Sequence, residues 1–226
     1  MSASTCGVCG APAQPAFVAP QPEIAPDLDM RPGEPTRSTL RDWILVCPKC
    51  GATAPDVSAL PASARAVVES EEYRMLSTTV LEETLPFRRW ALICASAGNR
   101  AEQAEALLQA AWAADDAAAM TEAARLRVQV AALWDGTKDV ELGLRRLDVL
   151  RRAGQFDAAD AWAAGMARRG PDEVARSVVA FQQARVAARD VGRHLISSAL
   201  PPPAYAPHVS HGKRATTGFW SRLLRK

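Results

Sequence analysis

At 226 residues, 48% of them hydrophobic, the chain is long enough to bury a sizeable core as one large domain or two small ones. The net charge of +2 is small, and no run approaches the roughly 18–20 apolar residues that a helix needs to cross a bilayer. No apolar stretch follows Met1, so we expect neither a secretory signal nor a membrane span, and a cytoplasmic protein is the default expectation.

Four of the five cysteines form two short pairs in the first quarter of the chain. The pairs are Cys6-Gly-Val-Cys9-Gly10 and Cys47-Pro-Lys-Cys50-Gly51. Two thiolates three residues apart on a tight turn can bind one Zn²⁺, and the glycine permits the positive φ that closes the turn. Four protein sulfurs fill a tetrahedral site and leave no position for water or substrate. The sequence therefore predicts one structural zinc ion bound by Cys6, Cys9, Cys47 and Cys50.

A redox dithiol is the competing interpretation of a Cys-x-x-Cys pair. That chemistry normally uses a single pair at the N-terminus of a helix within a βαβ unit. Here there are two pairs and no βαβ pattern, and prolines closely follow both pairs, at Pro12 and Pro15 and at Pro55. A shared zinc ion is therefore favoured over a redox pair and over disulfides.

The segment between the two pairs is a long insert. Residues 10–38 contain seven prolines, so they can form neither a continuous helix nor a central strand. The insert also carries Asp27, Asp29, Arg31 and Arg37. We interpret this alternation of acids and arginines mainly as ion pairs that hold the insert on the ribbon or on the first helices. A site for a small anion or a peptide carboxylate at the arginines is the alternative.

A strand and a series of helices follow. The segment Leu40–Val46 leads into the second cysteine pair and is the best strand candidate of the chain. From Pro61 onward, apolar residues recur at helical spacing. We predict helices over about 61–76, 86–98, 100–114, 116–134, 138–153 and 156–168, and a last helix that begins at 171 and carries its apolar face as far as 195. The short breaks between them indicate antiparallel hairpins stacked side by side.

The segment Leu147–Pro171 resembles a tetratricopeptide repeat from its middle onward. Gly154 and Phe156 mark a turn between two helices, small residues such as Ala159 allow the helices to approach, and the proline ends the unit. The predicted fold class is therefore mainly α, with tetratricopeptide-like helical hairpins and a small N-terminal β zinc ribbon. We expect a zinc-ribbon module with its Pro-rich insert over 1–58, the helical domain over 61–198, and a disordered basic tail over 199–226.

The tail carries the excess positive charge of the chain. Residues 191–226 contain six basic and no acidic side chains. Near the end, Phe219, Trp220, Leu223 and Leu224 can share one side of a short helix that is flanked by Arg222, Arg225 and Lys226. Such a segment can contact an anionic membrane surface weakly or enter a groove of a protein partner. A solubilising disordered tail is the alternative.

A resemblance to a known family rests on four features: the two cysteine pairs, the segment Asp27-Leu-Asp29-Met-Arg31-Pro32, the segment Thr36-Arg37-Ser38, and the stretch from Trp43 to Gly51. Together they resemble a bacterial family of uncharacterised zinc-ribbon proteins in which a helical-repeat region follows the second pair. The resemblance covers most of residues 5–170, with its specific motifs in 6–51. Gly7 stands where the first pair of that family often has a proline. The resemblance implies zinc binding and no established activity.

Groups for catalysis are scarce. The histidines are His194, His208 and His211, all at or beyond the last predicted helix, and neither a Gly-rich phosphate loop nor a His-Glu-x-x-His motif is present. Adjacent acids such as Asp115-Asp116 are interpreted as solvated surface or helix capping. The chain is therefore expected not to be an enzyme.

The favoured function is a zinc-binding adaptor or scaffold for protein partners, located in the cytoplasm or peripherally at the inner face of the membrane. A nucleic-acid-binding zinc ribbon with a helical oligomerisation domain is one alternative. Residues 1–60 carry four basic and six acidic side chains, and this balance disfavours contact with phosphates. A thiol redox or metal-dependent enzyme is the other alternative.

Overall fold

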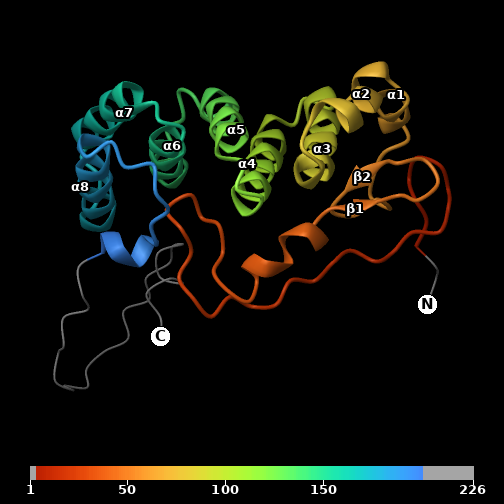
Figure 1. Ribbon diagram of the computed structural model, residues 1–226, viewed down its shortest axis with the longest axis horizontal. Helices are drawn as coiled ribbons and strands as arrows, with labels where there is room; N and C mark the ends of the chain where they lie inside the picture. The colour runs from red at the N-terminus through yellow and green to blue at the C-terminus, as the bar shows by residue number, and fades with distance from the viewer. Residues whose placement is uncertain (1–3, 201–226) are drawn as a thin grey trace.

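The computed structural model describes residues 4–200, and these are mainly α-helical. Figure 1 shows α3–α8 side by side in a row, with a small two-stranded sheet beyond the α3 end and the N-terminal segment running along one side of the row. The predicted fold class, mainly α with a small N-terminal β element, is confirmed. No helix within residues 4–200 combines the length and the apolar character that a bilayer crossing requires.

The elements follow the chain in the predicted general order. They are the 3-10 helix η1 (Arg37–Asp42), strands β1 (Leu45–Val46) and β2 (Thr53–Ala54), helices α1 (Ala64–Val68) and α2 (Glu71–Thr79), the 3-10 helix η2 (Glu82–Thr84), helices α3 (Leu85–Ser96), α4 (Arg100–Asp116), α5 (Met120–Leu133), α6 (Val140–Arg152), α7 (Phe156–Arg168) and α8 (Glu173–Ala187), and the 3-10 helix η3 (Ile196–Ala199). The strands pair antiparallel, with Leu45 opposite Ala54. Helix α7 coincides with its predicted range.

The predicted strand Leu40–Val46 is wrong over most of its length. Its first residues belong to η1, and only Leu45–Val46 form a strand. Local side-chain bonds explain the difference, because the Trp43 indole N–H donates to the Thr39 hydroxyl at 2.9 Å and that hydroxyl donates to the Thr36 carbonyl at 2.7 Å. These spacings of four and three residues are satisfied by a helical turn and not by an extended chain.

Three of the predicted helices have different ends. The helix predicted over 116–134 begins only at Met120, because α4 continues to Asp116 and Ala118 adopts a left-handed φ of 57°. The segment 61–76 is split between α1 and α2, because the Ser70 side chain caps α2 by accepting from the Tyr73 N–H. The last helix stops at Ala187 instead of continuing to Leu195, since Arg189 adopts a left-handed φ of 51°. The chain then turns back, and Leu195 forms an antiparallel bridge with Asp27 of the insert.

Two apolar clusters hold the described residues together. One joins Leu28, Leu40 and Ile44 of the N-terminal segment to the helices from α3 to α8. The other joins Cys6 and Cys47 of the ribbon to residues of α1, α2 and α3. Each cluster therefore draws on both sides of the predicted boundary between 1–58 and 61–198, and that division into domains stays a prediction.

Candidate metal centre and buried ion-pair network

Both cysteine pairs fold into the same backbone turn. In the first turn the Cys6 carbonyl accepts from the Gly10 N–H and the Cys6 N–H donates to the Ala11 carbonyl, each at 2.8 Å. The second turn repeats this pattern at Cys47, with distances of 2.9 and 2.8 Å. Gly10 and Gly51 have φ values of 71° and 72°, as the sequence predicts, because L side chains rarely adopt this conformation.

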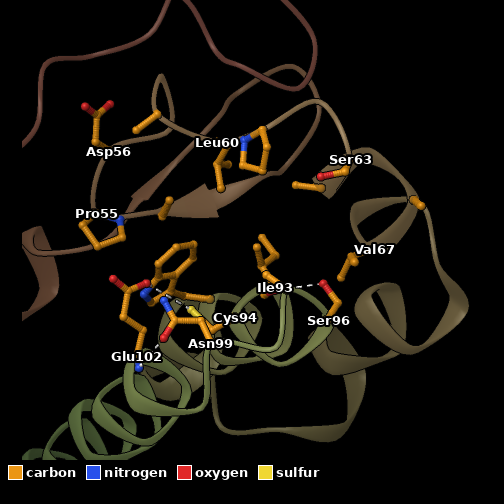
Figure 2. A pocket seen from close by; sticks show the side chains of 17 residues that line it. Pro55, Asp56, Leu60, Ser63, Val67, Ile93, Cys94, Ser96, Asn99 and Glu102 are labelled. Atoms are coloured by element: carbon orange, nitrogen blue, oxygen red, sulfur yellow. Dashed lines mark hydrogen bonds between the residues drawn. The ribbon is translucent and has the colours of Figure 1, made fainter.

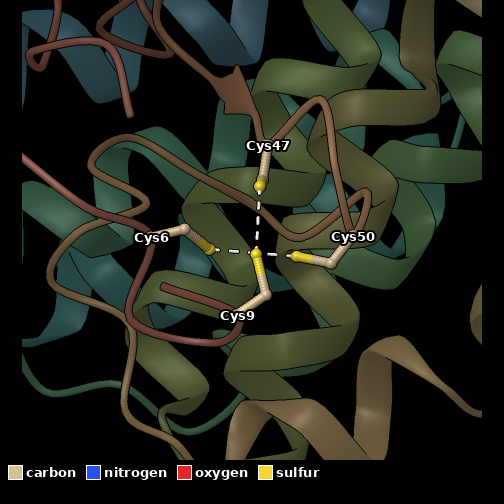
Figure 3. A group of neighbouring side chains, drawn as sticks. All are labelled: Cys6, Cys9, Cys47 and Cys50. Atoms are coloured by element: carbon tan, nitrogen blue, oxygen red, sulfur yellow. Dashed lines mark hydrogen bonds between the residues drawn. The ribbon is translucent and has the colours of Figure 1, made fainter. Parts of the chain in front are cut away.

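The two turns bring four sulfurs together (Figure 3). The sulfurs of Cys6, Cys9, Cys47 and Cys50 all lie within 4.8 Å of one another. Cys6 and Cys50 are 3.8 Å apart, and Cys9 and Cys47 are 3.6 Å apart. A tetrahedral ion with metal–sulfur bonds of about 2.3 Å separates its ligands by about 3.8 Å. The donor set therefore fits one tetrahedral metal ion, and it is the one such group of ligand atoms found in residues 4–200.

Proton binding and cation binding are coupled in this cluster. Burial acts to raise the pKa of Cys47, but backbone N–H groups of Cys50 and Lys49 stabilise its thiolate and the pKa is lowered to about 7. Burial raises the pKa of Cys50 to about 12, and its thiol neighbours act in the same direction. Metal ions bind the thiolate form of cysteine. A cation at the centre therefore favours the loss of the proton that the Cys50 thiol otherwise retains at neutral pH.

The glycine at position 7, between the cysteines of the first pair, has a structural reason. Its N–H donates to the Val57 carbonyl at 3.0 Å, and a proline has no N–H to donate. A Cβ atom at this position would lie 1.9 Å from the Leu60 carbonyl oxygen. The first turn is thus packed directly against the loop that follows β2.

The second turn rests on the first helices. The Tyr73 hydroxyl of α2 donates to the Gly51 carbonyl at 2.8 Å and also lies 2.8 Å from the Thr53 hydroxyl oxygen. The Arg89 guanidinium of α3 lies 4.9 Å from the centre of the Tyr73 ring. The cysteine cluster therefore belongs to the core that joins the ribbon to α2 and α3.

The insert is fixed to the helices through Asp29, whose exposed fraction is 0%. Its carboxylate accepts from the Trp112 indole N–H at 2.8 Å, from Arg152 at 3.1 Å and from the backbone N–H of Arg31 at 3.2 Å. Arg127 lies 4.0 Å from the same carboxylate. Burial alone would raise the pKa of Asp29, but the guanidinium groups of Arg152 and Arg127 outweigh it and the pKa is lowered.

Two acids assigned to the surface by the sequence interpretation complete this network. Asp115 is only 13% exposed and accepts from Arg127 at 2.9 and 2.5 Å and from Arg152 at 2.6 Å. Asp116 is 53% exposed and pairs with the buried Arg31 at 2.5 Å. The solvated-surface interpretation is therefore wrong for Asp115. The sequence carries no signal for these pairs, because their partners lie on separate helices or in the insert.

Asp27 and Arg37 pair with each other. Their side chains are 2.8 Å apart, and Asp27 is 1% exposed. Burial raises the pKa of Asp27, although the Arg37 hydrogen bond acts in the opposite direction. The structure thus places the four insert residues, Asp27, Asp29, Arg31 and Arg37, in ion pairs with this chain's own side chains. The helices that receive Asp29 and Arg31 are α4, α5 and α6, in the middle of the row.

Other residues singled out in the sequence lie elsewhere. Cys94 is 2% exposed in α3, outside the sulfur cluster, and its sulfur is 3.8 Å from the Glu102 carboxylate. The histidines His208 and His211 lie outside the described residues. So do the predicted contact residues of the tail, Phe219, Trp220, Arg222, Leu223, Leu224, Arg225 and Lys226.

Comparisons with models of protein families, with curated proteins and with solved structures found no match. The resemblance to bacterial zinc-ribbon proteins therefore stays a prediction that rests on the residues in 6–51.

Proposed function

We propose that this chain is a non-enzymatic adaptor for protein partners, built around one structural Zn²⁺ ion bound by Cys6, Cys9, Cys47 and Cys50. The observation that carries the proposal is the convergence of four cysteine sulfurs within 4.8 Å. Four protein ligands complete a tetrahedral shell, so no position remains for a water molecule or a substrate. An ion held in this way stabilises a fold and has no part in a reaction.

The donor chemistry supports zinc. Tetrahedral four-sulfur sites in proteins bind zinc or iron, and zinc has no redox chemistry to contribute. The backbone N–H groups directed at Cys47 favour the thiolate that such an ion needs. In this proposal the ion fixes the orientation of the two turns and, through Tyr73, the position of the ribbon on α2.

The arrangement of the helices supports an adaptor. Tetratricopeptide-like hairpins commonly present one extended face to a partner. Here the insert occupies one side of the row, where Leu28, Leu40 and Ile44 join the helical core (Figure 1). The proposal therefore assigns partner binding to the surfaces that the insert leaves exposed, and not to the side that it covers.

Crosslinking and pull-down of the full chain from its native cell test this proposal. Cys47→Ser removes one ligand of the cluster, and Cys94→Ser is the matched control because Cys94 is equally buried but lies outside it. We expect Cys47→Ser to lose both zinc and its captured partners, and Cys94→Ser to retain them.

Two outcomes would contradict the proposal. One is turnover of a small substrate by the purified zinc-loaded chain, abolished in Cys47→Ser while the helical circular dichroism is retained. The other is salt-dependent binding of the full chain to DNA or RNA at the ribbon, which assigns the zinc module to nucleic-acid recognition.

A further inference from the structure

A groove with a volume of about 660 Å³ lies between the ribbon and the first helices. Figure 2 shows its walls, with Pro55 and Leu60 from the loop after β2 on one side, Ile93 from α3 on the other, and Val67 from α1 at one end. Trp90 also lines the groove. Its volume lies in the range that is typical of binding sites, and its position between two parts of a fold is equally typical.

The charged side chains that line this groove have one sign. Asp56 and Glu102 are the charged residues among those that line it, and no lysine or arginine does so. Cys94 also faces the groove, and burial together with the nearby Glu102 raises the pKa of its thiol to about 12, so the thiol is uncharged at neutral pH. An apolar segment that carries positive charge matches this lining best.

We propose that this groove is the docking site of the chain's own C-terminal segment, Gly218–Lys226. The segment contains four large apolar side chains, Phe219, Trp220, Leu223 and Leu224, and three basic ones, Arg222, Arg225 and Lys226. When the segment is helical, its apolar side chains share one side and can fill the groove between Leu60 and Ile93. Its basic side chains then meet the carboxylates of Asp56 and Glu102.

The length of chain before this segment is sufficient for docking within one molecule. The described chain ends at Leu200, just after η3, which packs against α8 at the far end of the row. Packed helices lie about 9 Å apart, so five steps from α8 to α3 cover about 45 Å. Residues 201–217 can span about 56 Å when extended. The segment can therefore reach the groove of its own chain.

Zero-length carbodiimide crosslinking of the zinc-loaded full chain tests this inference. The reagent joins a lysine amine to a carboxylate in direct contact, and the sequence has four lysines, Lys49, Lys138, Lys213 and Lys226. We expect a crosslink within one chain from Lys213 or Lys226 to Asp56 or Glu102, located by peptide mass spectrometry. Mixing isotopically labelled and unlabelled chains distinguishes crosslinks within one chain from those between two.

Matched variants connect the crosslink to the groove. Ala66 of α1 is exposed and lines the groove, whereas Ala158 is exposed on α7, far from it. Arginine does not react with the reagent, so neither substitution adds a crosslinking site. We expect Ala66→Arg to lower the yield about tenfold, by blocking the groove and repelling the segment, and Ala158→Arg to leave it unchanged.

Hydrogen exchange of the full chain gives a second readout that does not depend on lysines. Trp220→Ser weakens the apolar contact from the side of the segment, and we expect faster exchange of the α1 and α3 amides that border the groove. Equal exchange in Trp220→Ser and the natural chain, together with no crosslink from the segment to the groove, would overturn the inference. Crosslinks found only between two chains would overturn it as well, because they assign the groove to a second copy.

Discussion

Replacing Asp29 by asparagine removes one negative charge from a fully buried site while keeping the size of the side chain. The carboxylate accepts hydrogen bonds from Trp112 at 2.8 Å and from Arg152 at 3.1 Å. Removal of one partner of a buried ion pair typically costs about 3–5 kcal/mol, because the other charge stays buried with less compensation. Since Asp115 still pairs with Arg152 in the variant, we expect the free energy of unfolding to fall by about 3 kcal/mol, at the lower end of that range.

Urea unfolding of the zinc-loaded full chain, followed by far-ultraviolet circular dichroism, measures this change. The control is Asp135→Asn, since the Asp135 side chain is 69% exposed and also pairs with an arginine, Arg146, at 2.7 Å. Exposed pairs contribute at most about 1 kcal/mol, so the control is expected to change stability little. If Asp29→Asn lowers the free energy of unfolding no more than Asp135→Asn does, buried charges do not hold the insert on the helices.

Three further predictions concern the ribbon and the effect of pH. Gly7→Ala places a Cβ atom 1.9 Å from the Leu60 oxygen, and we expect it to lower the free energy of unfolding, measured in urea, by about 1–3 kcal/mol. The control Gly165→Ala, whose Cβ has its nearest contact at 3.8 Å, is expected to stabilise α7. Equal effects of the two substitutions on stability would contradict this prediction. The pKa of Asp29 is lowered in the folded state. Its carboxylate therefore contributes fully to the free energy of unfolding above the unfolded pKa of about 4, and this contribution is lost as the pH falls through the folded-state pKa. The difference in melting temperature between the natural chain and Asp29→Asn should therefore narrow as the pH falls below about 4, and a constant difference would contradict this. Removal of the metal by a chelator should increase hydrogen exchange in the ribbon and in α1–α3 before it does so in α4–α7, and uniform loss of protection would contradict a local role for the ion.

The sequence is sufficient to predict the parts of the fold that depend on neighbouring residues. The two cysteines of each pair are three residues apart, and the glycine that follows them predicts the positive φ observed at Gly10 and Gly51. The helices between α3 and α7 are bounded by local signals, such as Gly98 and Gly154, whose φ values of 71° and 72° end a helical turn. These signals need no knowledge of tertiary contacts.

The buried ion-pair network cannot be predicted from such local signals. Asp29 meets Trp112 and Arg152 across separations of 83 and 123 residues, and nothing local distinguishes these arginines from solvated ones. The acids of the insert are recognisable as unusual within a proline-rich segment, but their partners on α4, α5 and α6 are not. Strand propensity also gives the wrong conformation for η1. Hydrogen bonds among Thr36, Thr39 and Trp43 stabilise a helical turn there instead.

Native mass spectrometry of the purified full chain tests the central claim most directly. We expect one zinc ion per chain, retained in Cys94→Ser and lost in Cys47→Ser, because the four sulfurs of Cys6, Cys9, Cys47 and Cys50 form the complete ligand set. A chain that carries no metal, or one that keeps its metal in Cys47→Ser, would contradict the account.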